Sequence, residues 1–383
     1  MSDTVAKILT SFEALRSELT RLGPGWSEHP ESDFFCTLDW FENLAKNGLD
    51  EGAMSGRLAL LFVVSPRSGL AACLPLVSGT KLVSLSNYYS SFFSAMLWER
   101  AGSETPLNQV SDFYQNATKL FATLIQTQLA GQAELQLSPM DSKTAFVAGL
   151  ASALKTSGFW TDFFFCFGNW YLQVAQRRFD VYRTSLPSAL QHSIDRGQRR
   201  LSKHGDWGFH VQTHVDANLD AAIADFNNVY RQSWKRPEPH DAFIPSLIRL
   251  AAQKQWLRMG ILRLDGKPVA AQFWMVKNNK ASIFKLAYVQ GFERFSPGSV
   301  LTARLMRHVL DIDKVSEVDY LTGDDAYKKD WMSHRRERWG LLAFRGSSAR
   351  GWVRAARHFL GKALRKVFRQ TQVERIGPWE SRQ

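Results

Sequence analysis

The chain has 383 residues, of which 45% are hydrophobic and 22% are charged, values typical of globular proteins. This composition excludes global disorder and collagen-like or coiled-coil structures. Its 3 cysteines contain no CxxC pair, which excludes a disulfide scaffold and a structural zinc site. The formal net charge of +12 indicates polyanionic partners: phosphates, nucleic acid or a membrane surface.

The N-terminal half predicts helices separated by short strands. Apolar residues at helical spacing predict a first helix over residues 1–22, ended by Gly23, Pro24 and Gly25. A turn at residues 65–69 joins two strand-like runs into a predicted hairpin. Further helices are expected at residues 39–44, 110–129 and 144–157, and strands at residues 57–64, 70–77, 81–85, 134–137, 159–167 and 171–174.

The C-terminal half repeats this alternation without an internal sequence repeat. Asp265 and Gly266 form a strong turn signal between two strand-like runs, which predicts a second hairpin. Helices are expected at residues 186–204, 219–234, 244–254 and 299–311, and strands at residues 209–213, 257–264, 267–277, 281–289 and 318–322. The pattern predicts a mixed α/β fold with helices inserted between antiparallel hairpins.

No apolar run approaches the about 20 residues needed to cross a bilayer. Residues 1–22 carry charges throughout and do not form a secretory signal. These features predict a soluble cytoplasmic protein whose cysteines are buried thiols.

Ser296, Pro297 and Gly298 follow a predicted strand and open a predicted helix. The first N–H groups of a helix are free and its dipole favours anions. Pro297 suits a helix start, and Gly298 leaves room for a phosphate close to the backbone. The pattern predicts an anion site, and an ordinary helix cap is the alternative interpretation.

Several segments between residues 176 and 345 carry a resemblance to a known family. They are a basic helix at residues 186–205 and the segments 230–235, 258–272, 285–288, 296–298 and 321–331. In this order and spacing they resemble the GNAT-type acyltransferase domain of the CelD-like group of cellulose biosynthesis, which is related to the FemAB aminoacyl transferases. The strand at residues 69–76 is similar to one of the same group. Val289 departs from the pattern, since the family often has an acid there.

The resemblance implies two GNAT-like lobes with a cleft between them, at residues 1–175 and 176–345, and a tail at residues 346–383. Mixed, mostly antiparallel sheets flanked by helices are the implied fold. The implied reaction moves an acyl group from acyl-CoA to an amine or hydroxyl of a polysaccharide or envelope precursor. The implied donor-binding residues are Arg294, Ser296, Gly298, Ser299, Val300 and Lys328. The classical GNAT signature contains more glycine and arginine than this turn.

Acyl transfer needs a deprotonated nucleophile, a stabilised oxyanion and a protonated leaving group. The resemblance implies Tyr327 as the leaving-group acid, because it follows the last predicted strand. Asp324 is the candidate base, and Lys285 is expected to pair with Asp324 or with a phosphate. The candidate acceptor-binding residues are Trp234, His240, Gln272 and Tyr288. Aromatic packing of Tyr327 with Trp331, a helix cap at Asp324 and a structural Lys285–Asp324 salt bridge are the alternatives.

Residues 351–370 predict a basic amphipathic helix. No acid occurs between Phe344 and Gln372. The predicted apolar stripe contains Trp352, Ala356, Phe359, Leu360, Ala363 and Val367, and the basic residues are Arg354, Arg357, Lys362, Arg365, Lys366 and Arg369. Three interpretations remain open: contact with an anionic membrane, contact with nucleic acid, and docking of the stripe on the protein itself.

Two other functions fit the same features. A FemAB-type enzyme uses aminoacyl-tRNA, which is a polyanion like CoA, so net charge does not separate the donors. A degenerate acyltransferase fold can instead serve as a membrane-associated scaffold of polysaccharide synthesis. We expect no DNA partner. We also expect no metal, because His204, His210 and His214 span a turn and a strand. A peripheral position at the inner face of the cell membrane is compatible with the tail.

Overall fold

The computed structural model describes residues 4–50, 57–101 and 107–375. Its strands are β1 (Val5–Leu9), β2 (Trp26–Glu28), β3 (Leu58–Ser65), β4 (Leu70–Ser78), β5 (Leu82–Ser84), β6 (Met96–Arg100), β7 (Glu134–Met140), β8 (Phe159–Gln173), β9 (Trp207–Gln212), β10 (Leu257–Leu264), β11 (Lys267–Lys277), β12 (Lys280–Tyr288), β13 (Glu317–Asp319) and β14 (His334–Arg345). Its helices are α1 (Phe12–Arg21), α2 (Leu38–Asn47), α3 (Leu107–Thr127), α4 (Ala145–Thr156), α5 (Phe179–Thr184), α6 (Ser188–His204), α7 (Leu219–Arg231), α8 (Phe243–Gln253), α9 (Pro297–Arg307), α10 (Ala326–Trp331) and α11 (Ala349–Arg375).

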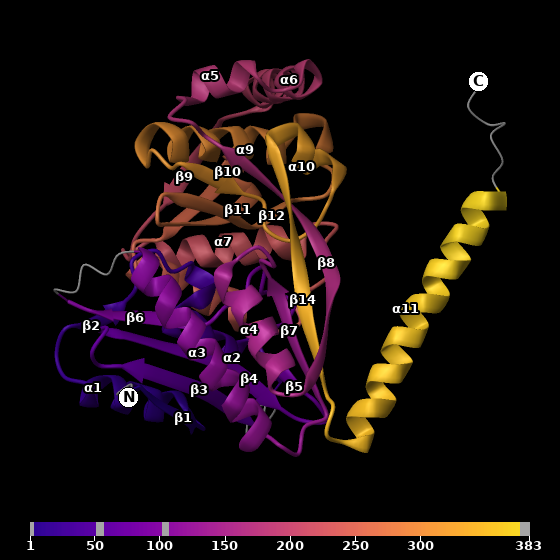
Figure 1. Cartoon of the computed structure of the whole chain (residues 1–383). Coiled ribbons are helices and arrows are strands. Elements are labelled where there is room, and N and C mark those ends of the chain that lie inside the picture. The colour runs from indigo at the N-terminus through magenta and orange to yellow at the C-terminus, as the bar shows by residue number, and fades with distance from the viewer. Residues whose placement is uncertain (1–3, 51–56, 102–106, 376–383) are drawn as a thin grey trace.

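The strands form one continuous sheet in which the same pattern occurs twice (Figure 1). In the N-terminal half, β3, β4 and β5 are antiparallel neighbours and β5 runs parallel to β7. In the C-terminal half, β10, β11 and β12 are antiparallel neighbours and β12 runs parallel to β13. The next strand is antiparallel in both halves: β14 beside β7, and β8 beside β13. The predicted mixed, mostly antiparallel α/β fold with two similar lobes is confirmed.

The long strands β8 and β14 connect the two halves. They pair with each other from His334–Tyr171 to Arg345–Phe159. The sequence predicted two strands in place of β8 and no strand at β14. The β14 prediction failed because the strand begins with the polar run at residues 334–338, which lacks the alternation of a half-buried strand.

The first predicted helix is wrong in its N-terminal part. Val5–Leu9 forms β1, which pairs antiparallel with β3, and helix α1 starts only after the Ser11 cap. Val5, Ile8 and Leu9 fit a helical stripe as well as a strand, so the apolar pattern could not separate the two. The backbone groups of β3 decided the outcome, because they need a partner at the sheet edge.

An apolar core joins the two halves. It contains buried side chains of α2, β3 and β4 together with those of α7, α8 and β10–β12. Trp40 of α2 lies edge-on to Phe243 of α8, with 5.7 Å between ring centres. A second apolar cluster lies on the other face of the C-terminal sheet, under α5, α6 and α9. The C-terminal sheet is therefore covered on both faces.

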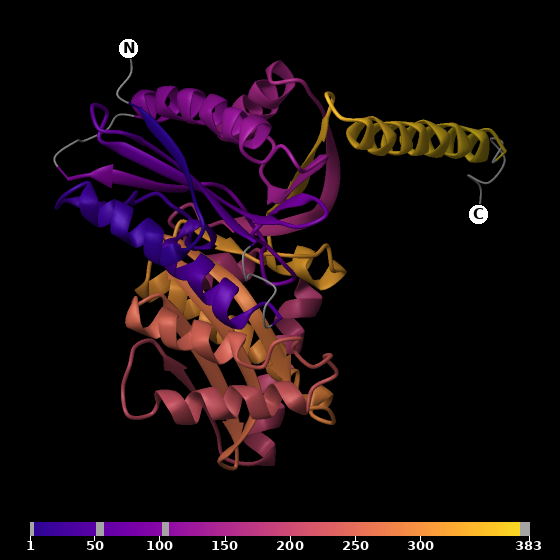
Figure 2. The ribbon, with the colours of Figure 1, turned by 90° about the horizontal axis from the view of Figure 1, so that it is seen from below.

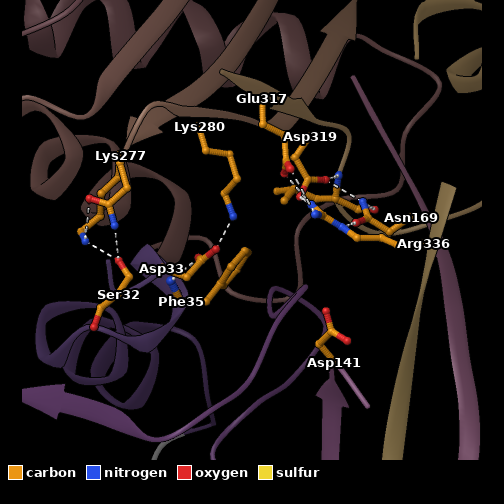
Figure 3. Close-up of polar contacts among 12 residues, drawn as sticks. Ser32, Asp33, Phe35, Asp141, Asn169, Lys277, Lys280, Glu317, Asp319 and Arg336 are labelled. Atoms are coloured by element: carbon orange, nitrogen blue, oxygen red, sulfur yellow. Dashed lines mark hydrogen bonds and ion pairs between the residues drawn. The ribbon is translucent and has the colours of Figure 1, made fainter. Parts of the chain in front are cut away.

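A polar network lies at the base of the parallel pair β12–β13 (Figure 3). Lys280 of β12 bonds to Asp33 of the N-terminal half. Arg336 of β14 bonds to Asp319, to Glu317 at 2.7 Å and to the Asn169 side-chain oxygen at 2.6 Å. Burial by itself would raise the pKa of Asp319, but Arg336 and Lys280 lower it below its usual value. The network fixes β12, β13 and β14 relative to one another.

Helix α11 leaves the body after its first turns, as the yellow helix in Figures 1 and 2 shows. Within the described residues, no helix combines the length and apolar character needed to cross a membrane. The side chains predicted at Arg365, Lys366, Val367 and Arg369 lie outside the side chains that the structure describes.

Candidate active site

The parallel strands β12 and β13 separate at one end. Their pairing runs from Lys280–Glu317 to Ser282–Asp319, where β13 ends, while β12 continues to Tyr288. The β12 ladder with β11 also shifts register beside Phe284, which marks a β-bulge. Diverging strands leave backbone groups without a ladder partner, and a bulge redirects them. The chain therefore leaves an opening between β12 and the residues that come after β13.

A cavity of about 210 Å³ lies at this opening. Residues from both halves line it, because Tyr88, Tyr89 and Ser91 reach it from the N-terminal half. The Ser91 hydroxyl also bonds to that of Thr322 across the boundary. The remaining lining residues are Lys235, residues 283–286, residues 320–322, Asp325, Tyr327 and Lys328.

Lys285 forms a nearly buried ion pair beside the cavity. Its Nζ atom lies 2.7 Å from Oε1 of Glu238, and each side chain is about nine-tenths buried. The ammonium also lies 3.2 Å from the Tyr88 hydroxyl and 5.3 Å from the centre of the Tyr89 ring. The predicted pairing of Lys285 with Asp324 does not form. No motif marks Glu238, which follows α7 in a loop, so the sequence did not indicate this partner.

Asp324 faces away from the cavity. Arg335 holds its carboxylate at 2.7 Å, and the indole N–H of Trp170 donates to it at 2.7 Å. The hydrogen bond from Arg335 is the main cause that lowers the pKa of Asp324. Gly323 has a φ of 103°, and its bridge to Asn169 turns the chain so that Asp325 lines the cavity instead. An exposed carboxylate already bound to arginine is a poor proton acceptor.

Tyr327 lines the cavity, and its role as leaving-group acid stays a prediction. Burial, followed by the charge of Asp325, raises the pKa of Tyr327 to about 12. The hydroxyl therefore stays protonated at neutral pH, as a leaving-group acid must. Its ring packs against Tyr320 at 5.7 Å rather than against Trp331, which is buried in the second apolar cluster.

Lys328 is buried in the cavity wall. Its ammonium bonds to the carbonyl of Thr322, to that of Gly323 at 3.3 Å and to Asp325 at 3.1 Å. These contacts hold the loop that carries Tyr327. Lys328 thus adds positive charge to the cavity while acting as a structural tie.

The predicted donor turn is fixed by neighbouring side chains. Ser296 has a φ of 47° and its hydroxyl lies 3.1 Å from that of Ser193. Val300 is fully buried, whereas Ser299 is half-buried. The Gln272 amide, also fully buried, donates to the Gly298 carbonyl at 3.0 Å. Gln272 therefore supports the turn from below and does not face a substrate.

Helix α6 lies against this turn and carries exposed positive charges. Gly197 permits the close approach, because a Cβ there would lie 2.5 Å from the Phe295 carbonyl oxygen. Arg200 donates to the Arg294 carbonyl at 2.6 Å. The exposed basic residues of α6 and of the turn are Arg196, Arg199, Arg200, Lys203 and Arg294, of which Arg200 contacts the turn directly. The free N–H groups of α9 and these cations together suit phosphate groups.

Among the other predicted acceptor residues, Trp234 and Tyr288 lie together at the end of β12. Trp234 is half exposed and packs on Tyr288, with 4.4 Å between ring centres. The His240 ring lies 6.3 Å from that of Tyr89. Lys235, which follows Trp234 in the chain, lines the cavity of about 210 Å³. It also lines a second cavity of about 450 Å³, and Glu238 lines that second cavity too. Burial, with the charges of Lys285 and Lys328, lowers the pKa of Lys235.

Residues 188–329 match the family described as the acetyltransferase (GNAT) domain. This segment is therefore similar to a GNAT acetyltransferase domain. It contains β12, β13, the donor turn and Tyr327, and it supports acyltransferase activity. No curated protein sequence matches the chain.

Solved structures give a coarser likeness. The crystal structure of FemX is 10% identical, covers 88% of this chain and 97% of its own, and has a TM-score of 0.54. The C-terminal domain of a putative lysylphosphatidylglycerol synthetase from Agrobacterium fabrum is 13% identical, covers 84% and 96%, and has a TM-score of 0.47. The similarity to FemX shows a shared two-lobed fold. Membership in the CelD-like group remains a prediction.

Proposed function

We propose that this protein transfers an acyl group from acyl-CoA to an amine or hydroxyl acceptor. The observation that carries the proposal is the cavity between the diverging strands β12 and β13 of the GNAT domain, with Tyr327 in its wall. A protonated tyrosine and several cations meet there in a partly enclosed space. Electrostatic stabilisation is strong in such a space because little water screens it.

The donor's phosphates are proposed to bind at the start of α9. Ser296, Gly298 and Ser299 supply the helix start, and α6 supplies the exposed cations beside it. Tyr288 connects the two parts of the site, since it ends β12 and lies against Gly298. A donor bound at the turn would extend its thioester along β12 toward the cavity.

In the proposed reaction the acceptor nitrogen or oxygen attacks the thioester carbonyl, forming the new C–N or C–O bond. The carbonyl oxygen becomes an oxyanion near the β12 bulge and the cavity cations. The C–S bond then breaks, and the Tyr327 hydroxyl gives its proton to the leaving thiolate. Lowering the pKa of Lys235 raises the fraction of its neutral amine form, and this form is the proposed acceptor of the proton that the acceptor group loses. The Lys285–Glu238 pair positions the acceptor from the second cavity.

The proposed acceptor is a polar precursor of a polysaccharide or of the cell envelope. The second cavity offers the mixed polar groups of Asn227, Arg231, Glu238 and Asp241. Such groups suit a ligand rich in hydroxyl or amino groups. This substrate class also rests on the resemblance of the sequence to the CelD-like group.

A second candidate is an aminoacyl-tRNA-dependent transferase. The exposed cations of α6 beside the donor turn favour it, because a row of cations can bind a nucleic-acid backbone as well as CoA phosphates. The two donors differ in salt dependence. Binding of tRNA would fall steeply as salt increases, since many counterions are released.

Isothermal titration with acetyl-CoA and CoA tests the proposed donor. We expect micromolar binding by the natural protein and its loss in Gly298→Glu, which places a carboxylate at the helix start. Gly131→Glu is the matched control, because a Cβ at Gly131 would meet no atom within 4 Å. Ser299→Glu repeats the charge without replacing a glycine. Absence of binding at millimolar ligand would reject acyl-CoA, and a tRNA titration across salt would follow.

A further inference from the structure

Helix α11 rests on the body through its polar side. Arg354 bonds to Glu134 at 3.0 Å, His358 to Asp162 at 2.7 Å and Lys362 to Asp162 at 2.7 Å. Burial opposes the ionised form of Asp162, but Lys362 and His358 still lower its pKa. Amphipathic helices usually bury the apolar side and expose the charged side. In α11 these charged side chains face the body instead, beside the buried Ala355, while the rings of Trp352 and Phe359 touch the body at Trp160 and Phe344.

Most of the large apolar surface of α11 is nevertheless exposed to solvent. Exposed fractions are 57% for Trp352, 69% for Val353, 63% for Leu360 and 58% for Leu364. Trp352, Leu360 and Leu364 occur at multiples of four residues, so they share one helix face, and Phe359 lies beside them. The α11 stripe is the set of five exposed apolar residues Trp352, Val353, Phe359, Leu360 and Leu364. A contiguous exposed apolar face on a basic helix marks an interaction surface.

We propose that the α11 stripe docks α11 on an anionic lipid bilayer. The stripe offers large apolar and aromatic side chains for the interface, and basic residues flank it without an acid between Phe344 and Gln372. Anionic headgroups would contact the flanking cations while the stripe enters the acyl boundary. This inference is independent of the proposed acyl transfer.

The charge of α11 disfavours the two other occupants. A second copy paired stripe to stripe would place like charges together, because neither helix offers acids between Phe344 and Gln372. A nucleic acid would need the cations outward, yet Arg354 and Lys362 are turned to acids of the body. A bilayer satisfies both the stripe and the remaining cations.

Vesicle sedimentation of the full chain tests the proposal. We expect binding to vesicles of phosphatidylcholine with about 30% phosphatidylglycerol, and weak binding to phosphatidylcholine alone. The double variant Leu360→Ser/Leu364→Ser should lower the partition coefficient at least about tenfold, because burial of each leucine is lost. Ala356→Ser/Ala363→Ser is the control, since it adds serines to exposed positions of the same helix while removing little apolar area.

Three results would overturn the proposal. They are no binding of the natural protein to anionic vesicles, equal binding by the leucine double variant, and a dimer mass in light scattering that this variant reduces to a monomer. Circular dichroism and thermal melting check that the variants fold. If the leucine variant fails to fold, Trp352→Ser serves instead, with the same expected direction.

Raising salt from about 0.1 M to about 1 M should also weaken binding, since charges are then screened within about 3 Å.

Discussion

The two halves of the sheet contain the same parallel pair but use it differently. In the C-terminal half, β12 and β13 diverge around a cavity. In the N-terminal half, the corresponding end of β5 and β7 is joined by side chains: the hydroxyls of Ser84 and Ser86 both donate to the Ser138 carbonyl, at 2.9 and 2.6 Å. The Ser138 N–H donates back to Ser84 at 3.1 Å.

The difference shows that topology alone does not make a site. Both halves supply a parallel pair, but side chains join the strand ends in the N-terminal half, whereas the strands diverge around a cavity in the C-terminal half. The N-terminal half closes its own pair and contributes the loop after β5, with Tyr88 and Tyr89, to the wall of the other cavity. We infer that one half holds the chemistry and the other shapes and supports it.

The largest expected effect is at Tyr327, which tests whether the chemistry lies in the C-terminal half. Tyr327→Phe should lower the rate of CoA release from acetyl-CoA about 10²–10⁴-fold, because the leaving thiolate loses its proton donor. The melting temperature should remain nearly unchanged, since the phenol is at the cavity wall. Tyr114→Phe, which changes a half-buried tyrosine of the N-terminal half, is the control and should keep full activity. Full activity of Tyr327→Phe would move the chemistry elsewhere.

The next largest effect concerns the Lys285–Glu238 ion pair, which lies between the two cavities of the C-terminal half. Lys285→Met leaves Glu238 nearly buried without its cation and should lower the free energy of unfolding by about 3 kcal/mol. The control is Arg249→Met, whose pair with Asp220 is largely exposed and whose loss should cost less than about 1 kcal/mol. Urea unfolding measures both. Equal losses would show that the Lys285 pair is not specially buried.

A pH effect tests the network at the base of β12 and β13. The folded pKa of Asp319 is lowered, so its contribution to stability is present above its unfolded pKa of about 4 and is lost as pH falls through the folded value. Between pH 6 and pH 3 the free energy of unfolding should fall about 1 kcal/mol further in the natural protein than in Asp319→Asn. Identical pH slopes would show that Asp319 does not carry this linkage.

The smallest effect lies in the N-terminal half. Ser84→Ala should lower the free energy of unfolding by about 1 kcal/mol, because one donor to the Ser138 carbonyl and one acceptor for its N–H are lost. CoA release should not change. A large loss of activity with full stability would show that the closed pair of this half also takes part in the chemistry.

Short patterns in the sequence predicted the local structure near the site, and the chemical roles assigned to its residues stay predictions. The donor turn at Ser296–Gly298, the hairpin across Asp265 and Gly266, and Tyr327 in the cavity depend on short patterns that act within a few residues. The partners of the charged residues were missed, because Glu238 and Arg335 carry no motif. An ion pair forms between side chains that the fold brings together, and spacing along the chain does not encode it.

Composition and local patterning by themselves determined the α/β class, most helices, the GNAT resemblance and the basic amphipathic character of α11. Tertiary structure decided the rest. Pairing with β3 made Val5–Leu9 a strand, because a sheet edge satisfies backbone groups that a helical stripe does not. Contacts of Asp162 with His358 and Lys362 decided which side of α11 faces water. Both outcomes depend on the position of distant groups, which a periodic pattern cannot specify.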